Sequence, residues 1–92
     1  MLLDDCVIGN GQYYMGSMNI TKTGRACQAW KDQSPHSHET PPDVFPQIKF
    51  GENHCRNAGG DEYTPWCFTM DLNTRWEHCN IPSCGKLAKA LI

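Results

Sequence analysis

Six cysteines in a chain of 92 residues constrain the fold more than any other feature of this sequence. Their number is even and no Cys-x-x-Cys pair occurs, which is typical of a disulfide framework formed in an oxidising compartment. Fifteen pairings of six cysteines are possible, and the sequence alone selects none of them. A chain this short forms one domain and buries only about 60–70% of its unfolded surface. We therefore expect cross-links to supply much of the stability, and reduction to unfold the chain.

Composition excludes several classes of protein. The eight glycines and six prolines favour turns over long helices. A formal net charge of −2 with mixed signs gives no electrostatic basis for binding nucleic acid or an anionic membrane. No apolar run reaches the roughly 18 residues of a membrane span. Because the first residues lack the features of a signal peptide, we expect a module excised from a larger secreted or membrane-anchored protein.

The most specific stretch runs from Cys55 to Cys67, Cys-Arg-Asn-Ala-Gly-Gly-Asp-Glu-Tyr-Thr-Pro-Trp-Cys. Together with Cys-Gln-Ala-Trp at 27–30 and Arg-Trp-Glu-His-Cys at 75–79, it resembles the kringle over residues 5–85. The resemblance implies a small disulfide-rich fold, mostly loops with short antiparallel β-hairpins. It also implies the bridges Cys6–Cys84, Cys27–Cys67 and Cys55–Cys79. Residues 1–4 and 86–92 would then be a chain end, linker or tail.

Aromatic and aliphatic residues predict where the core lies. Trp30, three residues after a half-cystine in a chain with few aliphatics, is expected to pack on the disulfides. We expect Phe45 and either Ile48 or Phe50 to join it. Residues 31–46 hold four prolines and no helical period, so they predict an ordered loop.

Two short alternating segments, 65–70 and 74–79, predict a β-hairpin with its turn at 71–73. On an alternating strand Trp66 and Phe68 project to one face while Cys67 points inward. Trp76 and His78 would share a face of the partner strand. These positions predict an exposed aromatic patch on a rigid hairpin.

Catalytic and metal chemistry find little support in the residue pattern. His36 and His38 could chelate an ion, but no carboxylate or thiolate accompanies them at zinc-site spacing, so we expect them to bond loop carbonyls. The adjacent Asp61 and Glu62 would point apart rather than act as an acid–base pair. No nucleophile elbow occurs and no free thiol remains once three bridges form. We expect a non-catalytic module with no metal and no cofactor.

Plasminogen-type kringles resemble this chain in the aromatic hairpin, and some of them bind lysine. The resemblance implies aromatic walls, a cation for the ligand carboxylate, and carboxylates for its ammonium. The matching positions here are Trp66, Phe68 and Trp76 for the walls, Arg75 for the cation and Asp61 for the anionic end, where the adjacent Glu62 is a candidate to compensate in part for a missing carboxylate. Gly59-Gly60-Asp61 replaces the Asp-x-Asp of lysine-binding members, so weak or no lysine binding is expected. Two other interpretations stay open: the aromatics brace the hairpin, or they form a protein-contact patch.

Among kringles, the motifs at 21–24, 35–38 and 45–46, with Gly59-Gly60, are most similar to the kringle of ROR-type receptor tyrosine kinases. That resemblance implies an extracellular, monomeric contact or spacing module beside a Wnt-binding domain of a receptor. Its partner would be a protein or a neighbouring domain. The alternative is a lysine-binding kringle of a plasminogen-like secreted protease or growth factor. The sequon at 19–21 makes Asn19 a glycosylation candidate.

Overall fold

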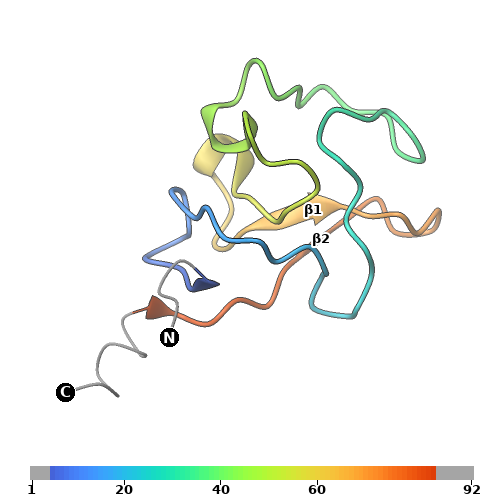
Figure 1. Ribbon diagram of the computed structural model, residues 1–92. Helices are drawn as coiled ribbons and strands as arrows, with labels where there is room; N and C mark the ends of the chain where they lie inside the picture. The colour runs from blue at the N-terminus through green and yellow to red at the C-terminus, as the bar shows by residue number, and fades with distance from the viewer. Residues whose placement is uncertain (1–4, 85–92) are drawn as a thin grey trace.

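The computed structural model describes residues 5–84. Its regular elements are two single-turn 3₁₀ helices, η2 (Pro46–Ile48) and η3 (Ala58–Gly60), and two strands, β1 (Trp66–Phe68) and β2 (Trp76–His78). Loops, turns and isolated backbone bridges make up most of the remaining chain (Figure 1). The expected small, loop-rich fold with a short antiparallel hairpin is confirmed. In the described part of the chain no helix has the length and apolar character needed to cross a bilayer.

The hairpin is shorter than the sequence predicts. β1 and β2 pair antiparallel, with Trp66 opposite His78 and Phe68 opposite Trp76. Beyond these pairs the Thr69 N–H still donates to the Arg75 carbonyl at 3.0 Å, and Thr69 also forms an isolated bridge with Cys27. Its hydroxyl also accepts a hydrogen bond from the Asp71 backbone N–H at 3.0 Å. The turn is therefore fixed by a threonine side chain, and the regular ladder spans only three residues on each strand.

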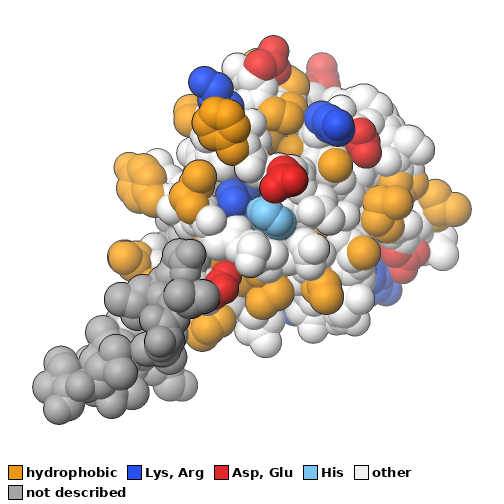
Figure 2. All heavy atoms as spheres, in the orientation of Figure 1, with side chains coloured by type: hydrophobic (Ala, Val, Ile, Leu, Met, Phe, Trp, Pro, Cys, Tyr) orange, Lys and Arg blue, Asp and Glu red, His pale blue; other side chains and the backbone are white. Residues whose placement is uncertain are grey.

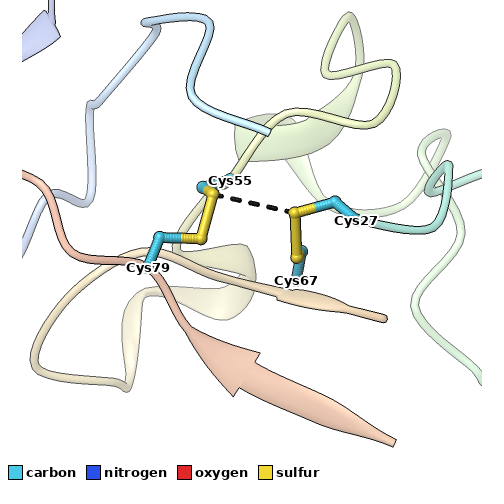
Figure 3. A group of neighbouring side chains, drawn as sticks. All are labelled: Cys27, Cys55, Cys67 and Cys79. Carbon is cyan, nitrogen blue, oxygen red and sulfur yellow. Dashed lines mark hydrogen bonds between the residues drawn. A yellow bond between two sulfur atoms is a disulfide. The ribbon is translucent and has the colours of Figure 1, made fainter. Parts of the chain in front are cut away.

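The three disulfide bonds have the pairing that the family resemblance implied: Cys6–Cys84, Cys27–Cys67 and Cys55–Cys79. The two inner bonds lie side by side against one face of the hairpin (Figure 3), with the Sγ atoms of Cys27 and Cys55 3.8 Å apart. Neither sulfur carries a hydrogen in the oxidised form, so this contact is van der Waals packing. The outer bond spans 78 residues and, in the loop-entropy description, stabilises the fold by roughly 4–5 kcal/mol.

Trp30 forms the centre of the core, as predicted, with 1% of its surface exposed. Its ring meets Trp66 and Phe68 edge-on, at centroid distances of 5.1 and 5.8 Å. Its indole N–H donates to the His54 carbonyl at 2.8 Å. The buried tryptophan is thus both packed and hydrogen-bonded, which avoids the cost of an unpaired buried donor.

Ile48, and not Phe50, fills the second core position. Ile48 is completely buried and Phe45 packs against the core, whereas Phe50 is 75% exposed. The Ile48 N–H donates to the Phe45 carbonyl, closing the 3₁₀ turn. Residues three apart share a face in a 3₁₀ helix, so Phe45 and Ile48 point inward together. Phe50 lies beyond that turn and faces solvent.

The two ends of the described chain meet. The Val7 N–H donates to the Pro82 carbonyl at 2.9 Å, and the Cys84 N–H donates to the Val7 carbonyl at 2.7 Å. Together with the Cys6–Cys84 bond, these contacts bring the first and last described residues to one side of the molecule (Figure 1). The expected boundaries at 1–4 and 86–92 lie outside the described residues.

Candidate ligand-binding cleft

A cleft of about 320 Å³ opens against the hairpin. All six residues proposed from the sequence line it, together with one that sequence reasoning missed, Ala58. Nothing in the sequence marks an alanine as a cleft residue, since its role is only to leave space. The six come from two segments, the loop after η3 and the hairpin: Asp61, Glu62, Trp66, Phe68, Arg75 and Trp76.

The loop that carries the two carboxylates is held by the buried side chain of Asn57. Its Nδ2 donates to the Asn10 carbonyl at 2.8 Å and to the Glu62 carbonyl at 2.7 Å, and its Oδ1 accepts from the Glu62 N–H. Gly59 and Gly60 have φ angles of 84° and 73°, in the left-handed region that side-chain-bearing residues rarely adopt. The Gly-Gly pair therefore makes the tight turn that delivers the carboxylates to the cleft.

The aromatic lining differs from the predicted exposed patch. Trp66 and Trp76 meet at a centroid distance of 5.6 Å, and Trp76 is the most accessible of the cleft aromatics, with 41% of its surface exposed. Phe68 is only 5% exposed. His38 stacks on Phe68 at 4.5 Å with an interplanar angle of 12°, so the 31–46 loop covers that ring. The prediction that Phe68 shares an exposed face with Trp66 is wrong, and Phe68 forms the base of the cleft.

Arg75 is fixed at the Phe68 side of the cleft. Its guanidinium carbon lies 5.1 Å from the centre of the Phe68 ring, and Nη1 donates to the Ser37 carbonyl at 2.7 Å. These contacts orient the cation without neutralising it, because neither partner is an anion. The remaining guanidinium donors are available to a ligand carboxylate.

The two carboxylates have different surroundings. The Glu62 Oε1 atom accepts a hydrogen bond from His78 Nε2 at 2.8 Å, and the Tyr63 ring lies 4.3 Å from the His78 ring. Asp61 is exposed and makes no ion pair with any side chain in residues 5–84. Asp61 is therefore the carboxylate that is free to receive a cation, while Glu62 already has a partner.

Charge is separated along the hairpin. His78, and with it Glu62, lies at the level of Trp66 in the strand register, whereas Arg75 lies against Phe68. Two residues along a strand span roughly 7 Å. The arrangement suits a ligand with a positive group at one end, a negative group at the other and an apolar stem between them.

The remaining sequence candidates have structural surroundings. His36 and His38 each place Nε2 2.8 Å from a backbone carbonyl, of Asp71 and Asp32 respectively, as predicted. The sulfur atoms of four cysteines lie within 4.8 Å of one another (Figure 3), but they form two disulfide bonds and so offer no thiolate to a metal. Asn19 is exposed. Charged side chains of both signs are interspersed on the face drawn in Figure 2.

Comparison with known proteins identifies the class of this fold. Residues 6–84 match the family model of the kringle domain, and the chain belongs to the kringle family. A kringle is itself non-catalytic, and the three disulfide bonds mark an extracellular module. The chain is 44% identical over 82 residues to plasminogen of Capra hircus. That match covers 89% of this chain and 66% of the relative, just under two thirds of its length.

Proposed function

We propose that this kringle recognises a lysine-type ligand, such as the C-terminal lysine of a cleaved protein, and binds it weakly. The observation that carries the proposal is that Asp61, the aromatic rings and Arg75 line a single cleft. Similarity to plasminogen supports the same choice, because plasminogen-type kringles include lysine binders.

Each part of the cleft has a task in this proposal. Asp61 pairs with the ligand ammonium, and Trp66 with Trp76 covers the methylene stem and the cation. Arg75 receives the ligand carboxylate through charge-assisted hydrogen bonds. Its contact with Ser37 orients the guanidinium before the ligand arrives, which reduces the entropy lost on binding.

We expect weak binding because the anionic end of the cleft has lost a carboxylate. Gly59-Gly60-Asp61 provides one carboxylate where lysine-binding members have two, and Glu62 is engaged by His78. A lost charged contact costs about 1–3 kcal/mol, or roughly one to two orders of magnitude in affinity. We expect a dissociation constant in roughly the millimolar range.

The parent protein is also part of the proposal. The plasminogen relative supports a plasminogen-like parent and gives no support to the receptor and Wnt context expected from the ROR resemblance. The protein-contact interpretation is the second candidate, favoured by the 41% exposure of Trp76 on a rigid hairpin.

A fluorescence titration separates these two candidates. Trp66 and Trp76 line the cleft, so ε-aminocaproic acid should change the tryptophan emission in a saturable way. Hexanoic acid, which lacks the amine, should be much weaker because it cannot pair with Asp61. Equal responses to both compounds, or none at tens of millimolar, would leave the protein-contact candidate in place of lysine recognition.

A further inference from the structure

A second and larger groove, of about 980 Å³, lies apart from the cleft and shares no lining residue with it. Residues 26–31 and 48–53 contribute most of its lining, with Pro42 and Met70. We propose that this groove binds an acidic segment of a partner protein that inserts one aromatic or aliphatic side chain. The proposal does not depend on lysine recognition.

The apolar part of the groove supplies an anchor site. Trp30 and Ile48, almost fully buried, lie at its base, and the exposed Phe50 and Met70 line its rim. Exposed apolar side chains that adjoin a hollow are typical of interaction sites. Figure 2 shows hydrophobic side chains gathered at the right of the view, over the tip of the hairpin. Met70, which lines the groove, is 54% exposed. A side chain inserted over Trp30 would bury the exposed parts of Phe50 and Met70 together with its own apolar surface.

Charge identifies the kind of partner. Lys31 and Lys49 are both exposed in the groove lining, which contains a single acidic residue, Glu52. Neither lysine forms a salt bridge within the described residues. Lys49 Nζ lies 5.5 Å from the centre of the Phe50 ring, so a positive charge stands directly beside the apolar rim. The groove thus carries a net positive charge on a chain whose formal net charge is −2.

The combination of an apolar base with two exposed lysines favours a peptide ligand over a polyanion. Binding of a phosphate or sulfate polymer rests on many cationic contacts, whereas this groove offers two lysines beside an apolar base. The volume is at the upper end of the range of about 300–1,000 Å³ that small ligands occupy. A short segment with one buried anchor and flanking carboxylates fits both the volume and the charge.

The test uses a peptide blocked at both ends, acetyl-Asp-Glu-Phe-Asp-amide, which has no amine or terminal carboxylate for the cleft. Titrated into the ¹⁵N-labelled chain, it should shift the backbone amides around Lys31, Phe50 and Glu52. The indole signals of Trp66 and Trp76 should stay in place. The neutral peptide acetyl-Asn-Gln-Phe-Asn-amide should bind roughly fivefold or more weakly, because it lacks the charge pairs.

Variants localise the contact. Lys49→Glu should weaken binding of the acidic peptide roughly fivefold, and Phe50→Ala should weaken it at least as much. The matched control is Lys22→Glu, an exposed lysine outside the groove, which should change the affinity less than twofold. Asp61→Asn should also leave peptide binding unchanged, so failure of lysine recognition and failure of this proposal are distinguishable.

Several results would overturn the proposal. These are an absence of shifts at millimolar peptide, shifts centred on Trp66 and Trp76, or equal losses from Lys22→Glu and Lys49→Glu. Tighter binding of a heparin oligosaccharide at the same amides would also overturn it, because it would identify a polyanion site.

Discussion

Glu62 Oε1 accepts a hydrogen bond from His78 Nε2 at 2.8 Å, which ties the loop after η3 to strand β2. The two residues are 16 positions apart in the sequence, and the pair occupies the carboxylate that could otherwise have compensated for the missing aspartate of the Asp-x-Asp motif. Glu62 therefore acts first as a support for the cleft wall, and Asp61 is left as the ligand's anion.

Glu62→Gln tests this division of roles. Because the glutamine amide can still pair with His78, we expect the fold to persist and the affinity for ε-aminocaproic acid to fall by less than about threefold. Tryptophan fluorescence titration measures the change. A loss of tenfold or more would show that Glu62 itself holds the ligand ammonium.

Arg75→Gln tests the opposite end of the cleft. Removing the guanidinium should weaken ε-aminocaproic acid roughly tenfold, since the ligand carboxylate loses its charged partner. Pentylamine has no carboxylate, so its weaker affinity should stay within about twofold of the wild-type value. Equal losses for both compounds would mean that the substitution disturbs the packing on Phe68 rather than a carboxylate contact.

Acid should destabilise the fold through Asp71. The Arg25 Nε–H donates to Asp71 Oδ2 at 2.7 Å, and this hydrogen bond, with that from the Asn73 backbone N–H, holds the pKa of Asp71 below its ordinary value. Between that lowered pKa and the value of about 3.9 in an unfolded chain, the unfolded state binds more protons. The stabilisation is thus complete above about pH 4 and is lost as the pH falls through the folded-state pKa.

Melting curves between about pH 5 and pH 2 measure this effect. The melting temperature of Arg25→Gln should fall less steeply with acid than that of the wild type, because its Asp71 loses the Arg25 hydrogen bond, which is the largest cause of the lowered pKa. Lys22→Gln removes a nearby exposed charge and serves as the control. Parallel curves for wild type and Arg25→Gln would rule out this source of acid sensitivity.

The core assignment predicts a contrast between two neighbouring apolar residues. Ile48→Ala should reduce the free energy of unfolding by about 2–5 kcal/mol, because Ile48 is completely buried and truncation leaves a cavity. Phe50→Ala should change it by less than about 0.5 kcal/mol, since Phe50 is 75% exposed. Denaturant unfolding with the disulfides intact compares them, and similar losses would contradict the assignment.

Local pattern and family resemblance predicted different parts of this structure. Alternation located the hairpin, and the resemblance supplied the disulfide pairing that six cysteines alone leave open. Alternation assigns a side chain to a face but does not show what covers that face, so it missed the burial of Phe68 under His38. The choice of Ile48 over Phe50 depended on the 3₁₀ turn at Pro46–Ile48, which is too short to leave a periodic signal.

The candidate site, too, could be predicted only in part from the sequence. Five of the six cleft residues could be named because each matches a position of the family motif, and Glu62 was named as the neighbour of Asp61 that could partly compensate for a missing carboxylate. The partners that set their roles come from segments remote in sequence: Ser37 for Arg75, His78 for Glu62 and Asn57 for the whole loop. These contacts follow from how the loops fold over the hairpin, and no single stretch of sequence records them.

The most direct test of lysine recognition compares Asp61→Asn with the wild type in an NMR titration with ε-aminocaproic acid, following the indole N–H signals of Trp66 and Trp76. Asp43→Asn, an exposed aspartate outside the cleft, is the control. We predict saturable shifts for the wild type and Asp43→Asn, and a loss of at least tenfold in affinity for Asp61→Asn with its spectrum otherwise unchanged. Equal affinities for all three proteins, or no shift in any, would contradict lysine recognition by this cleft.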